Sequence, residues 1–322
     1  MLHVYVENQV GRAAAYRISP DAFQAVMPED VSLSIHESDA PDLPALAQAD
    51  VFVGSGFDIE RLRRAAPRLR LVHCTSAGVE RYLPLDWLPP GAKFTNSSGI
   101  HAQKAAEYAA MALLMLHTRF PTFCDDQRAR RWEPRLTPSI VGQRVLIVGL
   151  GRLGCAVARA ATALGMEVEG ISRHGFPVDS VAPVYPGTAF SERVRFCDYL
   201  LLCCPLTVET HGLVNADTIR SMKRGAGIVN MARGPVVVTS DLVDSLRNGH
   251  LSGAVLDVVD TEPLPASASV WDTPNLIITP HISCDTPTGY TSKAIKILAR
   301  NLARLRVGEP ELENEVSAEL GY

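Results

Sequence analysis

The feature that most constrains this chain is the alternation of short apolar runs with segments that have the period of an amphipathic helix. In the second half of the chain the runs are apolar on both faces, as expected for parallel strands that helices cover on both sides. The runs predicted to be strands are 2–6, 31–35, 50–54, 70–74, 144–148, 167–171, 198–203, 227–231, 253–258 and 275–279. This order predicts an α/β fold built of doubly wound parallel sheets.

The chain has 322 residues, which is more than one ordinary hydrophobic core accommodates, so two domains are expected. Two long helical patterns, roughly 101–119 and 291–308, flank the second series of strands, and the later one ends at Gly308, a residue suited to a helix C-cap. If these helices carry the chain out of one domain and back, the second domain is inserted into the first. We therefore expect residues 1–99 and 285–322 to form a discontinuous substrate-binding domain. Residues 100–284 would form a Rossmann-type dinucleotide-binding domain, with ligand in the cleft between the two.

Composition narrows the classes of partner. A formal net charge of −4 and the lack of a long run of like charge argue against a nucleic-acid or membrane-surface partner. The longest apolar run, 108–116, is far shorter than the ~20 residues that span a bilayer. The seven cysteines show no spacing typical of a metal site, and Cys203 and Cys204 are expected inside an apolar strand. We expect no metal, reduced thiols and a cytoplasmic protein without a signal peptide.

The stretch "GLGRLG" at 149–154 is a complete GxGxxG between a predicted strand and a predicted helix. Gly149 permits the tight turn, Gly151 lets the backbone approach a pyrophosphate, and Gly154 allows close packing of helix on strand. Amides at the helix start, among them those of Arg152 and Leu153, would then face the phosphates. The motif predicts dinucleotide binding, and the alternative is a glycine-rich turn without a ligand.

The residues near position 172 bear on the choice of cofactor. An acid that binds the adenosine ribose is expected about 20 residues after the glycines. Here Ser172 and Arg173 stand at that place, 18 and 19 residues after Gly154. A serine does not repel a 2′-phosphate, and a guanidinium forms a fork that suits one. We therefore predict a preference for NADP(H). In the alternative, Arg173 points to solvent and NAD(H) serves as well.

Polar side chains follow three of the later strands. They are Arg233 in "NMARGPVVV", Asp257, Asp260 and Glu262 in "LDVVDTEPLP", and His281 in "NLIITPHIS". Singly, each has a structural interpretation as a surface arginine, turn acids or a structural histidine. Together they suit reduction of a carbonyl beside a carboxylate. A guanidinium binds the acid, an imidazolium protonates the nascent alkoxide, and a neighbouring carboxylate favours the protonated imidazole.

The order "GLGRLG", "CPLTVET" (204–210), "NMARGPVV", "LDVVDTEPLP" and "TPHIS" resembles the D-isomer-specific 2-hydroxyacid dehydrogenases over most of the chain, most weakly in the first 70 residues. The resemblance implies catalytic roles for Arg233, Glu262 and His281. It also implies that Asp257 holds the nicotinamide carboxamide. Further cofactor contacts are implied at Pro205, Thr207, Thr210, Met231 and Ala232.

The stretch "TSAGVE" at 75–80 is similar to the substrate loop of that family. The resemblance implies that the amides of Ala77 and Gly78 bind the substrate carboxylate together with Arg233. A plain structural turn is the alternative.

Family members are generally dimeric, which implies a homodimer. Trp132 could edge the pocket, but packing below the helix at 101–119 is the preferred interpretation.

We therefore expect an NADP(H)-linked oxidoreductase that interconverts small 2-oxo acids, such as glyoxylate or hydroxypyruvate, with D-2-hydroxy acids. Reduction is the expected direction, and the substrate is the only expected partner besides a second copy of the chain. The alternative from another class is a nucleotide-sensing binding protein on the same scaffold. It is disfavoured because a sensor needs no proton donor. A formate dehydrogenase is disfavoured because the resemblance would then require a glutamine where Glu262 stands.

Overall fold

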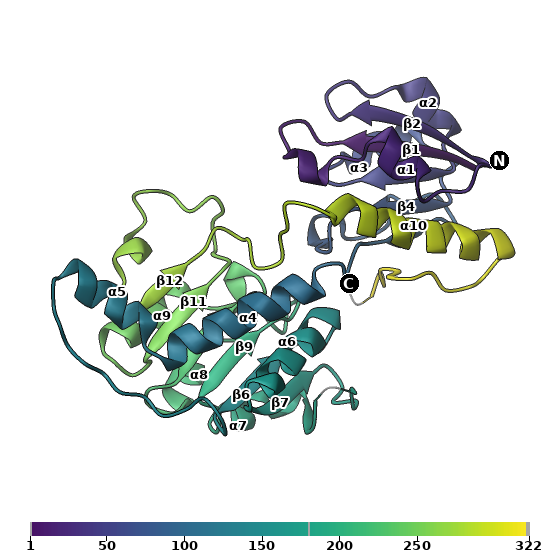
Figure 1. The fold of residues 1–322 in the computed structure, drawn as a ribbon. Helices are drawn as coiled ribbons and strands as arrows, with labels where there is room; N and C mark the ends of the chain where they lie inside the picture. Colours follow the sequence, from purple (N-terminus) through teal and green to yellow (C-terminus); the bar gives the residue numbers. More distant parts are fainter. Residues whose placement is uncertain (1, 180, 320–322) are drawn as a thin grey trace. The chain divides into compact units, whose positions relative to one another are not determined.

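The computed structural model describes residues 2–179 and 181–319, and the chain divides into two compact units. The first unit takes the described residues up to Ile100 and from Thr286 onward, and the second is the continuous stretch His101–Asp285. Each unit is a parallel sheet with helices on both faces (Figure 1). The expected fold class, two doubly wound α/β domains with one inserted into the other, is confirmed. The division falls one residue from the boundaries drawn on the sequence.

The first unit contains a five-stranded parallel sheet in the order β2-β1-β3-β4-β5. Its strands are β1 (Leu2–Asn8), β2 (Val31–Glu37), β3 (Val51–Gly54), β4 (Leu71–Cys74) and β5 (Lys93–Thr95). Its helices are α1 (Pro20–Gln24), α2 (Leu43–Gln48), α3 (Ile59–Ala65) and α10 (Tyr290–Val307). Neighbouring strand residues face opposite sides. Val4 and Val51 pack with α1 and α10, whereas Tyr5 and Phe52 pack with α2 and α3.

The second unit contains a seven-stranded parallel sheet in the order β12-β11-β10-β9-β6-β7-β8. Its strands are β6 (Arg144–Val148), β7 (Glu167–Ser172), β8 (Val184–Pro186), β9 (Tyr199–Leu202), β10 (Gly227–Asn230), β11 (Gly253–Leu256) and β12 (Leu276–Ile278). Its helices are α4 (Ala102–His117), α5 (Phe120–Arg128), α6 (Arg152–Ala163), α7 (Phe190–Arg193), α8 (Ala216–Ser221) and α9 (Thr239–Arg247).

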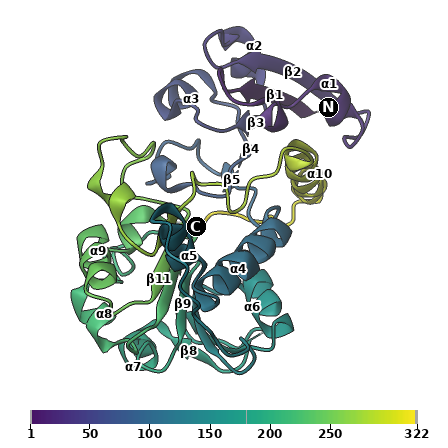
Figure 2. The same ribbon diagram turned by 60° about the vertical axis from the view of Figure 1, so that its left-hand side comes forward.

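The core of the second unit has a layer on each face of its sheet. Ile147 and Leu201 pack with α4 and α6, and Leu146 and Leu200 pack with α8 and α9. Figure 2 shows these two pairs of helices on opposite sides of the sheet. The chain runs outward from β6 in one direction through β7 and β8, and in the other through β9 to β12. Strand order therefore reverses between β6 and β9. In doubly wound sheets this is the place, at the carboxyl ends of the strands, where ligands bind.

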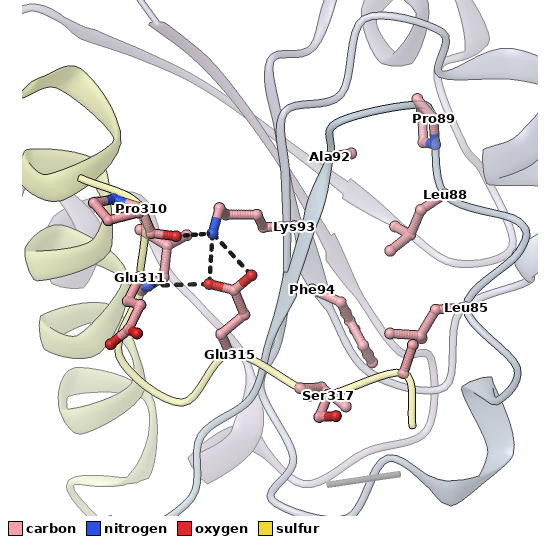
Figure 3. Close-up of a pocket in the computed structure, with 13 residues that line it drawn as sticks. Leu85, Leu88, Pro89, Ala92, Lys93, Phe94, Pro310, Glu311, Glu315 and Ser317 are labelled. Atoms are coloured by element: carbon pink, nitrogen blue, oxygen red, sulfur yellow. Dashed lines mark hydrogen bonds and ion pairs between the residues drawn. The ribbon is translucent and has the colours of Figure 1, made fainter. Parts of the chain in front are cut away.

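Two short edge strands were not predicted from the sequence. β5 and β8 have three residues each, too few to show an alternating pattern. The C-terminal segment covers the exposed side of β5, because the Val316 amide donates to the Phe94 carbonyl over 2.8 Å and the Lys93 ammonium lies 2.7 Å from the Glu315 carboxylate. Beside this contact lies an open hollow of about 700 Å³ (Figure 3). Covering an edge strand in this way prevents it from pairing with another chain.

Two local expectations are wrong. β9 ends at Leu202, so Cys203 and Cys204 follow the strand instead of lying inside it. Trp132 does not pack below α4: it is 96% exposed, in a segment without helix or strand between α5 and β6. The periodic pattern could not place Trp132, because that segment has no regular element to direct the side chain.

Among the described helices none is long and apolar enough to cross a membrane. The described residues contain no cluster of three or more potential metal ligands.

The buried face of α10 gives a test of the first unit's core. Leu298 is completely buried, whereas Val307 on the same helix is 75% exposed. Leu298→Ala should lower the free energy of unfolding by about 2–5 kcal/mol, because it removes buried methyl groups and leaves a cavity. Val307→Ala, the control, should change it by less than about 0.5 kcal/mol. Urea denaturation followed by circular dichroism measures both, and equal effects of the two variants would contradict the packing described here.

Candidate active site

Close backbone packing fixes the turn between β6 and α6. Gly149 has φ +95°, and a Cβ at this position would lie 2.6 Å from the backbone of Cys204. At Gly154 a Cβ would lie 1.9 Å from the Gly149 carbonyl oxygen. Only glycine fits at either position. The turn is therefore held against the end of β9, at the point where strand order reverses.

Gly151 differs from both neighbours, because a Cβ there would meet no atom within 4 Å. It is the N-cap of α6, and Cys155 is the first amide that bonds back into the helix, to the Gly151 carbonyl over 2.9 Å. Earlier amides of the first turn, including those of Leu153 and Gly154, are not used by the helix ladder. Open space in front of a helix N-terminus suits an anion, so the turn fits the pyrophosphate of a dinucleotide. The exposed side chain of Arg152 begins the same helix.

Ser172 and Arg173 lie at the carboxyl end of β7, next to β6 in the sheet. The Ser172 hydroxyl oxygen accepts a hydrogen bond from the Gly175 amide over 3.0 Å, which leaves its own proton to donate elsewhere. Arg173 is exposed. A hydrogen bond from the Thr207 hydroxyl and, more weakly, the positive charge of Arg173 lower the pKa of Glu209. The sequence did not single out Glu209 as an acidic neighbour of Arg173.

The loop after β9 is held by its own polar groups. The Thr210 hydroxyl donates to the Pro205 carbonyl over 2.7 Å and accepts from the Thr207 amide over 2.8 Å. Thr210 therefore shapes the segment for which the family resemblance implied cofactor contacts. Its side chain is already engaged within the loop.

A buried asparagine shapes the turn after β10. Asn230 accepts from the Ala232 amide over 3.0 Å and donates to the Arg233 carbonyl over 3.0 Å. Arg233 is half-buried and its Nη1 donates to the Ala232 carbonyl over 2.7 Å, while Met231 beside it is buried in the core. Nothing in the sequence singled out Asn230, because an asparagine at a strand end is common in turns.

Gly234 brings the turn after β10 against the segment after β11. A Cβ on Gly234 would lie 2.1 Å from the backbone of Val259. Thr239 adds a hydrogen bond to the Asp260 carboxylate over 2.7 Å. The segment that carries Arg233 is thus packed directly on the segment that leads to Glu262. Asp260 serves this structural contact.

His281 and Glu262 form a direct pair: Nδ1 of the histidine lies 2.7 Å from Oε2 of the glutamate. The other carboxylate oxygen of Glu262 accepts from the Val259 amide over 3.2 Å. His281 has φ +55°, a left-handed conformation that is uncommon for residues other than glycine. The imidazole is about half exposed, and its Nε2 makes no hydrogen bond within the described residues. The two residues come from the segments after β11 and β12, which are neighbours in the sheet.

Asp257 holds the turn that carries His281. It is almost completely buried, and its carboxylate accepts from the Thr279 hydroxyl over 2.6 Å and from the Ile282 and Ser283 amides over 2.8 Å each. The Tyr108 hydroxyl donates to the Thr279 hydroxyl oxygen over 2.6 Å, because the Thr279 hydroxyl donates its own proton to Asp257. Burial raises the pKa of Tyr108 to about 12, so the phenol stays protonated and keeps this bond. Any contact of Asp257 with a cofactor would be additional to these three.

In the first unit, the loop after β4 has its carbonyls bonded and two amides unused. Each of four consecutive carbonyls accepts a bond from a neighbouring segment: Cys74 from the Ser97 hydroxyl at 3.1 Å, Thr75 from the Tyr290 hydroxyl at 2.6 Å, Ser76 from the Ser97 amide at 3.1 Å and Ala77 from the Asn96 side chain at 2.9 Å. Within the described part of the chain the amides of Ala77 and Gly78 donate no hydrogen bond. Backbone amides without partners beside one another suit a carboxylate.

His73, the residue before Cys74 in β4, is buried next to this loop. It is fully buried, with Nδ1 2.9 Å from the Thr95 hydroxyl and Nε2 3.3 Å from the Ser97 hydroxyl. Burial lowers the pKa of His73 to about 4, so the ring is neutral near pH 7. His73 is therefore a structural link between β4 and β5.

Comparison with known proteins agrees with this geometry. Residues 110–283 match the model of the D-isomer specific 2-hydroxyacid dehydrogenase NAD-binding domain. The chain is 33% identical over 267 residues to a glyoxylate/hydroxypyruvate reductase A of Serratia proteamaculans, which covers 79% of this chain and 82% of that protein. A D-isomer specific 2-hydroxyacid dehydrogenase of Xanthobacter autotrophicus, solved with NADPH and MES, is similar over 99% of both chains with a TM-score of 0.87 and 29% identity.

A further solved structure is the NADPH-dependent glyoxylate/hydroxypyruvate reductase of Sinorhizobium meliloti, with NADP and sulfate, at a TM-score of 0.82 and 25% identity over 100% of both chains. The family model covers more than half of the chain, and several relatives above 30% identity match most of their length. This chain belongs to the D-isomer specific 2-hydroxyacid dehydrogenase family.

Proposed function

We propose that this enzyme reduces small 2-oxo acids to D-2-hydroxy acids with NADPH, with glyoxylate and hydroxypyruvate among its substrates. The observation that carries the proposal is the His281–Glu262 pair at 2.7 Å, on the sheet edge where the Gly149–Gly154 turn also lies. The glyoxylate reductases among the relatives support the substrate class. No observation favours the nucleotide-sensing alternative.

The second unit would carry the chemistry. Nε2 of His281 donates a proton to the oxygen that develops negative charge, and Glu262 orients the ring through Nδ1 and stabilises its cationic form. Arg233 binds the substrate carboxylate and polarises the adjacent carbonyl. The bound nicotinamide supplies the hydride.

Cofactor binding would use the open face of Gly151 and the first turn of α6 for the pyrophosphate. Ser172 and Arg173 would bind the 2′-phosphate, and the segments around Pro205, Thr207, Thr210, Met231 and Ala232 would line the nicotinamide half. Asp257 would contact the carboxamide. The first unit would bind the substrate carboxylate through the amides of Ala77 and Gly78.

We also propose that the enzyme is a homodimer. Trp132 and Leu136 are 96% and 98% exposed, four residues apart on one irregular segment. Large apolar side chains exposed together are typical of surfaces that another chain covers.

Removal of the proton donor should stop the reaction. His281→Gln keeps a polar side chain of similar reach but supplies no acid, so the rate of glyoxylate reduction should fall by about 10²–10⁴-fold. NADPH affinity, measured by fluorescence titration, should stay within a few-fold of the wild type. His250→Gln, at the amino end of β11, is the control and should retain activity. Near-normal turnover by His281→Gln would remove His281 from the mechanism.

Arg233 should act through its planar fork. Arg233→Lys keeps the charge but loses bidentate pairing, so kcat should fall and KM should rise. Steady-state kinetics with hydroxypyruvate measures both, and thermal unfolding checks the fold. A variant that is less stable but has unchanged kinetics would make the arginine structural.

Cofactor preference should follow positions 172 and 173. One charge-assisted hydrogen bond contributes about 1.5–3 kcal/mol, so kcat/KM for NADPH should exceed that for NADH by roughly tenfold or more. The double variant Ser172→Asp with Arg173→Ala should reverse the preference, because the new carboxylate repels the 2′-phosphate and accepts from the ribose hydroxyls. Equal use of both cofactors by the wild type would refute this assignment.

A further inference from the structure

Arg12, in the loop after β1, lies at the carboxyl edge of the first unit's sheet, the same edge as the Ala77–Gly78 loop. We propose that Arg12, with Ser55 and Tyr16, forms a second anion subsite that lets the enzyme take 2-oxo acids with a second acidic group at the far end. The inference rests on the proposed function and adds a substrate class to it.

Two contacts hold the guanidinium in place. Nη1 of Arg12 donates a hydrogen bond to the Ser55 hydroxyl, and the guanidinium carbon lies 4.6 Å from the centre of the Tyr16 ring. The side chain is half-buried. A stacked guanidinium with one nitrogen engaged keeps further N–H groups in a fixed plane, the arrangement that binds carboxylates bidentately.

Arg12 lacks the carboxylate partner that neighbouring arginines have. Arg17 pairs with Glu37, and Arg61 pairs with the buried Glu7. Within the described residues no carboxylate lies within ion-pair distance of Arg12. Partial burial of an unpaired cation is unfavourable, so such a group is typical of a place where an anion binds.

The Arg12 contacts lead directly to the substrate loop. Ser55 follows Gly54, which pairs in register with Cys74, the last residue before that loop. The Tyr16 ring meets the Tyr290 ring edge-on at 4.7 Å between centres. Tyr290 in turn donates to the Thr75 carbonyl over 2.6 Å. The Arg12 guanidinium is therefore linked through Tyr16 and Tyr290 to the loop that carries the unused amides.

Electrostatics agrees with this proximity. Burial raises the pKa of the Cys74 thiol to about 11, and the positive charges of Arg12 and Arg81 act in the opposite direction. The field of Arg12 thus reaches the base of the loop. Arg81, like Arg12, has no carboxylate within ion-pair distance in the described part of the chain.

The chemistry that suits the subsite is a 2-oxo dicarboxylate. Its 1-carboxylate would bind the amides of Ala77 and Gly78, and its distal carboxylate would bind Arg12. A neutral amide of the same shape keeps the size and loses the charge. Comparing each diacid with its amide therefore distinguishes a subsite that binds an anion from a site that only has space for the larger molecule.

The test compares oxaloacetate with 2-oxosuccinamate and 2-oxoglutarate with 2-oxoglutaramate, by kcat/KM with NADPH. The wild type should favour at least one diacid over its amide by tenfold or more. Arg12→Gln should lower kcat/KM for that diacid by about 10–100-fold and leave the amides and glyoxylate within about threefold. Arg12→Lys, which keeps the charge, should recover part of the loss. Arg17→Gln is the matched control, from the same loop but paired with Glu37, and should leave the preference unchanged.

Two results would overturn the proposal. One is a wild type that does not discriminate either diacid from its amide. The other is an Arg12→Gln variant that loses glyoxylate and diacid reduction equally while thermal unfolding shows an intact fold. In both cases turnover of glyoxylate by the wild type leaves the proposed function standing. Absence of turnover with every 2-oxo acid would instead overturn the proposed function, and this inference with it.

Discussion

The set of hydrogen bonds to the buried carboxylate of Asp257 is the interaction on which the position of His281 depends. Three donors from the segment after β12 meet on its two oxygens, and hydrogen bonds to an ionised acceptor are the strong ones in proteins. The same turn holds His281 at a positive φ, a conformation that surrounding structure must stabilise. Asp257 thus fixes the backbone, and the backbone aims the imidazole. Glu262 then only has to orient the ring.

Close contact between backbone segments is the second feature that fixes this edge of the sheet. Gly154 against Gly149, and Gly234 against Val259, are approaches that any side chain would prevent. They bring the turns after β6, β10 and β11 into fixed positions along one sheet edge. Because parallel strands all end at the same edge, residues far apart in sequence lie close together there. The glycine turn at 149–154 and the His281–Glu262 pair are therefore held along one edge of the same sheet.

The sequence predicted the large pattern well and the supporting polar contacts poorly. Ten strands, the long helices at 101–119 and 291–308, and the inserted layout could be read because apolar period and length are local signals. The supporting residues Asn230 and Tyr290 could not, because each acts on a backbone group that folding alone brings near. Trp132 was misplaced for a related reason, since the sequence says nothing about direction in a segment without regular structure.

The discontinuous layout has a consequence for synthesis. The second unit is one continuous stretch, whereas one face of the first unit's sheet is completed by Leu298 and its neighbours on α10, almost 200 residues after β5. During translation Val4 and Val51 emerge early together with α1, but they lack the cover that α10 supplies until residues 290–307 have been synthesised. The inserted unit can fold first and shortens the loop that must close. Until then one face of the first sheet stays partly uncovered in the nascent chain.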